Sequence, residues 1–87
     1  MEDLKSEQIA AKVNKRKRAT AAEMIEVILE LCQIKALDIR TIAVLINRGE
    51  ATTYNHYVMK LVREKRLARI YNKENSLWVY SVNKEEI

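Results

Sequence analysis

Apolar residues recur at helical spacing through the middle of the chain and predict three successive helices. The first is expected from residue 21 to about residue 34, with Ile28 and Leu31 on the side that faces the core. Thr20, followed three residues later by Glu23, matches a capping box and places the start of this helix at residue 21. The opposite side is acidic and polar, through Glu23, Glu26, Glu30 and Gln33.

Two shorter segments predict the second and third helices. The second is expected over residues 39–46 with Asp38 at its N-cap, and residues 47–49 supply a tight turn in which Gly49 is expected to adopt a positive φ. The third helix is expected from residue 50 or 51 to about residue 65. The side chains expected to pack it on the other two helices are Ala51, Tyr54, Val58, Leu61 and Val62.

The C-terminal third of the chain changes to strand composition. Residues 67–71 and 77–82 are rich in β-branched and aromatic residues, and residues 72–76 are typical of a turn. They predict a β-hairpin, in which Trp78 and Tyr80 pack across strands or in the core. The predicted fold class is therefore α+β, mostly α.

Three sequence segments resemble the winged helix-turn-helix superfamily of DNA-binding domains. Residues 42–47 (IAVLIN) are similar to the second helix of that family, residues 50–53 (EATT) to the opening of its recognition helix, and residues 61–67 (LVREKRL) to the exit into its first wing strand. The resemblance covers residues 21–82 and implies a three-helix winged helix-turn-helix with a C-terminal β-hairpin wing. The family commonly has a glycine near Lys65, and this chain does not.

Length and cysteine usage limit the organisation of the chain. Its 87 residues can enclose one small core, so we expect a winged-helix domain over residues 20–82, a tail over residues 83–87, and a basic N-terminal arm over residues 1–19 that is flexible or partly helical. Cys32, the single cysteine, lies among apolar neighbours and is expected to be a buried small hydrophobe. A disulfide within the chain is excluded, and zinc-ligand spacing is absent.

Positive charge is concentrated in two segments, although the net charge is only +4. Residues 12–18 hold five bases and no acid, and residues 40–73 hold eight bases against two acids. This distribution predicts one basic face that meets a polyanion. With no signal peptide and no apolar run long enough to span a bilayer, we expect no membrane contact and a soluble protein, cytoplasmic and nucleoid-associated, or nuclear in a eukaryote.

The predicted function is sequence-specific binding of double-stranded DNA by the third helix in the major groove, in transcription regulation. The residues expected nearest the base edges are Thr52, Thr53, Asn55 and His56. Those expected on the DNA backbone are Arg48, Lys60, Arg63, Arg69 and Lys73. The basic arm adds Lys12, Lys15, Arg16, Lys17 and Arg18.

The alternative hypothesis is a winged-helix module for protein–protein interaction, as an accessory domain of a larger nucleic-acid-processing or other complex. The candidate surface for a protein partner or a homodimer is then Met59, on the outward side of the third helix, or residues 1–20, where Leu4, Ile9 and Val13 are the apolar candidates. No nucleophile, Gly-rich phosphate loop or second titratable cluster accompanies the carboxylates of Glu23, Glu26 and Glu30, and His56 has no partner at metal-ligand spacing, so we expect no enzyme activity, no cofactor and no metal.

Overall fold

Helix α2 (Ala21–Ile34) begins where the capping box predicts. In the computed structural model, which describes residues 2–15 and 18–83 and only the backbone of residues 2–4, the Glu23 amide donates to the Thr20 hydroxyl at 3.1 Å. The Glu23 carboxylate accepts from the Thr20 amide at 3.0 Å. Two first-turn amides are thereby satisfied. The buried face of α2 consists of Met24, Val27, Ile28, Leu31 and Cys32.

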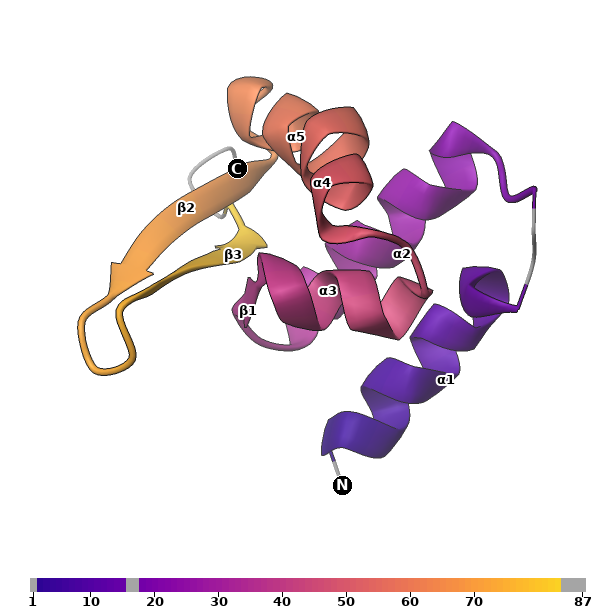
Figure 1. Cartoon of the computed structure of the whole chain (residues 1–87), viewed down its shortest axis with the longest axis horizontal. Helices are drawn as coiled ribbons and strands as arrows, with labels where there is room; N and C mark the ends of the chain where they lie inside the picture. The colour runs from indigo at the N-terminus through magenta and orange to yellow at the C-terminus, as the bar shows by residue number, and fades with distance from the viewer. Residues whose placement is uncertain (1, 16–17, 84–87) are drawn as a thin grey trace.

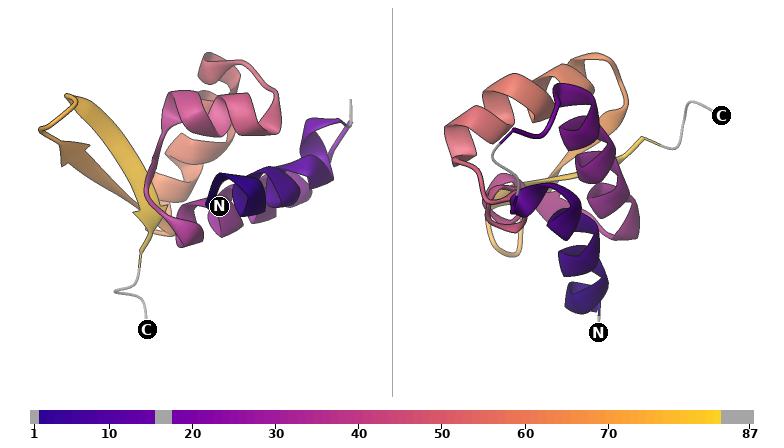
Figure 2. Two further views of the ribbon diagram at one scale, coloured as in Figure 1. Left: turned by 90° about the horizontal axis from the view of Figure 1, so that it is seen from below. Right: turned by 90° about the vertical axis from the view of Figure 1, so that its right-hand side faces the viewer.

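Helix α1 (Glu2–Asn14) lies along α2 and also contacts α3 (Figures 1 and 2). Ala10 and Val13 on α1 are fully buried, and the Lys12 ammonium lies 3.4 Å from the Glu30 carboxylate of α2. The sparse apolar spacing of residues 1–19 predicts a flexible or partly helical arm. Residues 2–14 form a helix, and this helix packs on the core, because the small Ala10 side chain lets α1 approach its neighbours closely.

Helix α3 (Ile39–Ile46) follows as predicted, but its turn differs from the prediction. Asn47 adopts the left-handed conformation with φ 57°, whereas Gly49 has φ −68°. The expectation that Gly49 supplies the positive φ is therefore wrong. Asparagine is one of the few residues besides glycine that tolerate this conformation, and the Asn47 side-chain amide also donates to the Asn14 carbonyl at 3.2 Å.

The predicted third helix is a continuous helical segment with a π-helical middle. It runs through α4 (Glu50–Thr53), η1 (Tyr54–Val58) and α5 (Met59–Arg63), and is called the composite helix below (Figure 1). The Met59 amide donates to the Tyr54 carbonyl five residues earlier. Such a segment acts like one inserted residue, so it rotates the two ends of the helix relative to each other by about 100°.

This rotation changes which residues of the first turn face the core. Val58 and Leu61 are buried as predicted, but Thr53 is buried and Ala51 is exposed. The expectation that Ala51 packs inward is wrong, because it assumes a uniform period of 3.6 residues across the π segment. The helix ends at Arg63, and Lys65 then adopts φ 63°, near the position where the resemblance leads one to expect glycine.

Three antiparallel strands complete the fold in the order β1-β3-β2. Strands β2 (Leu67–Asn72) and β3 (Leu77–Val82) form the predicted hairpin, which projects from the helices (Figures 1 and 2). Strand β1 (Leu37–Asp38) pairs with β3 and is too short to be predicted from composition. The predicted class, α+β and mostly helical with a C-terminal hairpin, is confirmed.

The core lies between the helices and one face of the sheet. Leu37, Leu67 and Tyr80 reach it from the three strands. The helices contribute Val13, Met24, Ile28, Leu31, Ile42, Ile46, Val58 and Leu61. None of the described helices is both long and apolar enough to cross a bilayer.

Candidate nucleic-acid interface

One side of the composite helix is polar and basic and faces solvent. Thr52, Asn55, His56, Lys60 and Arg63 are exposed along it. A shallow depression on this side is lined by Asn55, His56, Met59, Lys60, Arg63 and Glu64. The outer strip, as the term is used below, consists of the exposed residues Thr52, Asn55, His56, Lys60 and Arg63. All five are among the residues predicted to contact bases or phosphates, and they share one surface.

Thr53 does not belong to this surface. Its side chain is fully buried, and its hydroxyl donates to the Gly49 carbonyl at 2.8 Å, alongside the Thr53 amide at 2.9 Å. The expectation that Thr53 reaches a base edge is wrong, because the π segment turns this position toward the core. Thr52, one residue earlier, remains exposed.

Arg48 is engaged by the fold itself. Its guanidinium donates to the carbonyls of Ile46 at 2.9 Å, Asn47 at 3.1 Å and Val13 at 3.3 Å. These carbonyls lie at the C-terminal ends of α3 and α1, where a cation also stabilises the helix dipole. Arg48 therefore ties two helix ends together, and this geometry does not favour its predicted role as a contact to DNA phosphates.

The hairpin places its two predicted phosphate contacts differently. Lys73 is exposed in the turn, whereas the Arg69 guanidinium lies 4.2 Å from the centre of the Trp78 ring. The Trp78 ring also packs edge to face on the Tyr71 ring across the strand pair, with 5.1 Å between the ring centres. The cross-strand packing predicted for Trp78 is confirmed. Arg69 keeps an exposed side, but a cation–π contact fixes its position.

The described N-terminal basic residues differ in their surroundings. Lys12 is paired with Glu30 on α2, Lys15 and Arg18 are exposed, and Arg16 and Lys17 lie outside the described residues. In Figure 1 the C-terminal end of α1 and the tip of the hairpin lie on opposite sides of the molecule. The described part of this segment is therefore remote from the hairpin.

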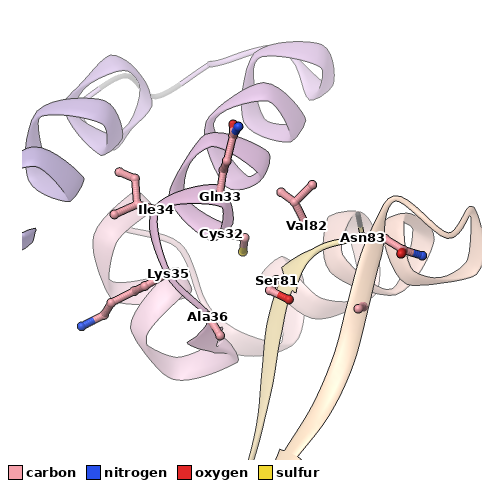
Figure 3. Close-up of a pocket in the computed structure, with 9 residues that line it drawn as sticks. Cys32, Gln33, Ile34, Lys35, Ala36, Ser81, Val82 and Asn83 are labelled. Carbon is pink, nitrogen blue, oxygen red and sulfur yellow. The ribbon is translucent and has the colours of Figure 1, made fainter. Parts of the chain in front are cut away.

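A pocket between the end of α2 and β3 contains Cys32 (Figure 3). Burial raises the pKa of the Cys32 thiol to about 12, so the sulfur is neutral at physiological pH. Its predicted role as a buried small hydrophobe is confirmed. No group of three or more potential metal ligands occurs among the described residues.

Exposed apolar residues occur where the sequence does not predict them. Val13 is fully buried, Ile9 and Met59 are partly buried, and the Leu4 side chain lies outside the described atoms, so α1 offers little of the predicted partner surface. Among the residues whose side chains the structure describes, the large exposed apolar ones are Val44, Ile70, Tyr71, Leu77 and Trp78. The sequence does contain a signal for the four exposed residues of the hairpin. Neither strand shows the apolar–polar alternation of a sheet with one solvated face, which indicates apolar side chains on both faces.

Comparison of the chain with protein-family models, with curated proteins and with solved structures finds no significant match. The geometry of the composite helix and the distribution of charge therefore stand alone as the basis for assigning a function.

Proposed function

We propose that this chain is a winged-helix domain that binds double-stranded DNA with sequence preference, in transcription regulation. The observation that carries the proposal is the outer strip: hydrogen-bonding and cationic side chains share one solvent-facing side of a single helix. The major groove of B-DNA admits a helix of this kind. Val58 and Leu61 hold the other side of the helix on the core, which leaves the strip available to a partner.

The roles within the strip follow from side-chain chemistry and position. Asn55 has an amide that pairs in bidentate fashion with adenine, and Thr52 and His56 can each donate or accept one hydrogen bond. Lys60 and Arg63 lie one to two turns further along and reach phosphates, which position the protein without reading sequence. Lys73, exposed in the hairpin turn, is a further candidate for phosphate contact.

The exposed apolar residues of the hairpin favour a second candidate function, a protein-interaction module. Ile70 and Trp78 are 50% and 45% exposed, which is more apolar exposure than phosphate contact requires. The two functions differ in a simple observable. A DNA-binding domain retains duplex DNA at low salt, whereas a module for protein contacts alone does not.

The test is the affinity for labelled duplexes, measured by fluorescence anisotropy at several salt concentrations. Lys60→Ala and Arg63→Ala each weaken binding to every duplex and reduce the slope of log K against log salt by about 1. Asn55→Ala changes the ranking of duplexes with little change in that slope. Lys5→Ala is the matched control, because Lys5 is an exposed base on α1 and not on the strip. Absence of duplex affinity at low salt overturns the proposal.

A further inference from the structure

Strand β2 forms an edge of the sheet. The order β1-β3-β2 leaves one side of β2 without a strand partner among the described residues. The strand has six residues, pairs in continuous register with β3 from Leu67 to Asn72, and contains no proline. An edge of this length, without a bulge, is a template for pairing with another strand.

The backbone groups that point away from β3 follow from one hydrogen bond. The Asn83 amide donates to the Arg66 carbonyl at 3.1 Å, so residue 66 directs its backbone groups toward β3. Because this direction alternates along an antiparallel strand, Ala68 and Ile70 also face β3. Leu67, Arg69 and Tyr71 therefore present their amides and carbonyls at the open edge.

Both faces of the hairpin beside this edge carry uncovered apolar side chains. On one face, Ile70 is 50% exposed opposite Val79, with Leu77 nearby at 43%. On the other face, Tyr71 is 44% exposed and packs against Trp78. A partner that extends the sheet covers both faces at once, whereas a helix or a flat surface covers only one.

We propose that two copies of this chain pair through their β2 edges, antiparallel, around a two-fold axis that is perpendicular to the sheet and lies midway between the Ile70 residues of the two copies. The second copy is a suitable occupant because the edge is complementary to itself. The second copy brings the same exposed apolar side chains of the hairpin and the same outward-facing backbone groups of β2. An isologous contact of this kind closes as a dimer. The inference does not rest on DNA binding, so its failure leaves the proposed function standing.

The length of β2 and its charge together select the register. Side chains directly opposite in an antiparallel pair share a face, so a two-fold axis perpendicular to the sheet lies between one residue and the same residue of the second copy. An axis at Arg69 or Ile70 pairs five residues of β2 with the second copy, whereas an axis at any other residue of the strand pairs three or fewer. An axis at Arg69 places two guanidinium groups opposite each other, and an axis at Tyr71 places Arg69 opposite Lys73 of the second copy. Both registers put like charges together, which is destabilising.

An axis at Ile70 avoids these like-charge pairs. Arg69 then lies opposite Tyr71 of the second copy, and both residues direct their backbone groups outward, so each such pair can exchange two backbone hydrogen bonds. Continued past the ends of β2 into the bend before it and the hairpin turn after it, the same register brings Arg66 near Glu74 of the second copy, and symmetry repeats this opposite-charge pair. The two Ile70 side chains meet at the axis and cover each other.

The first test is the mass of the full chain in solution, by sedimentation velocity from about 1 to 200 μM, a range chosen to span weak to moderate dimer affinities. The expected result is a shift with concentration toward twice the chain mass of 10.2 kDa. Ile70→Lys is expected to raise the dimer dissociation constant at least about tenfold, because it places two ammonium groups at the axis. Val44→Lys is the matched control, since Val44 is 72% exposed on α3 and is not part of β2.

The second test examines the register by charge reversal. Arg66→Glu and Glu74→Arg are each expected to weaken the dimer severalfold, because each creates two like-charge pairs, and the double variant is expected to restore it. Circular dichroism is the control that checks whether each variant is folded. A chain that stays monomeric throughout, a dimer that is insensitive to Ile70→Lys, or a double variant no tighter than the single variants each overturn the proposal.

Discussion

Arg48 distinguishes a structural role from a DNA-binding role most clearly. Replacing it with Met keeps the aliphatic length and removes three donated hydrogen bonds, to the carbonyls of Val13, Ile46 and Asn47. A hydrogen bond from a charged donor contributes about 1.5–3 kcal/mol when buried. The three share one half-buried guanidinium and are not additive, so we expect the free energy of unfolding to fall by about 2–3 kcal/mol.

The corresponding change in Tm is large for a chain of this size. With an unfolding entropy of about 2.1 cal/mol/K per residue, Arg48→Met is expected to lower Tm by about 10–15 °C. Arg48→Lys keeps the charge but has no planar fork with which to reach three carbonyls, and is expected to be of intermediate stability. Thermal unfolding by circular dichroism measures both variants. Duplex binding is compared at a temperature where all proteins are folded, and the salt slope is expected to be unchanged.

The opposite pattern would refute this reasoning. If Arg48→Met leaves Tm within about 2 °C of the wild type but reduces the salt slope by about 1, the guanidinium contacts phosphate in solution, as the sequence alone predicts. The contacts to the helix ends would then contribute nothing measurable to stability.

Three further predictions concern buried groups. Thr53→Val removes a buried hydroxyl but keeps the side-chain shape, so urea unfolding should show a loss of about 0.5–1.5 kcal/mol, with no change in duplex preference. Burial raises the pKa of Cys32 from 9.0 to about 12, so the unfolded chain loses this proton at a lower pH than the folded chain. The free energy of unfolding, measured by urea denaturation, should therefore fall between pH 9 and 12 by up to about 1.4 kcal/mol per pH unit. Cys32→Ala should not show this contribution to the pH dependence. Val13→Ala should cost about 2 kcal/mol because α1 belongs to the core, whereas the exposed Lys15→Ala should change unfolding by less than about 0.5 kcal/mol.

Local signals in the sequence predict most element boundaries. The Thr20 and Glu23 pair marks the start of α2, and strand composition marks β2 and β3 within about one residue. The turn before the composite helix is mispredicted because Asn47 and Gly49 both permit a left-handed residue, and composition does not decide between them. The extent of helix α1 and its contribution to the core could not be predicted, because its buried residues are small and few.

The candidate site is predicted less completely, for two physical reasons. Helical periodicity places Asn55, Lys60 and Arg63 together on the outside, but a π segment has no period of its own in the sequence, so Thr53 is assigned to the wrong side. A count of charges along the sequence treats all basic residues alike, whereas tertiary contacts give them different roles in the folded chain. Arg48 is bound to helix ends and Lys12 to Glu30, while Lys60 and Arg63 remain on the exposed strip.

Selection of bound duplexes from a random pool tests the central claim most directly. We predict that the wild-type chain enriches duplexes with a shared motif, that Asn55→Ala alters the motif, and that Lys60→Ala preserves the motif while lowering recovery. Failure of the wild-type chain to retain or enrich any duplex at about 50 mM salt, where phosphate contacts are strong, would contradict the assignment of the outer strip to DNA recognition.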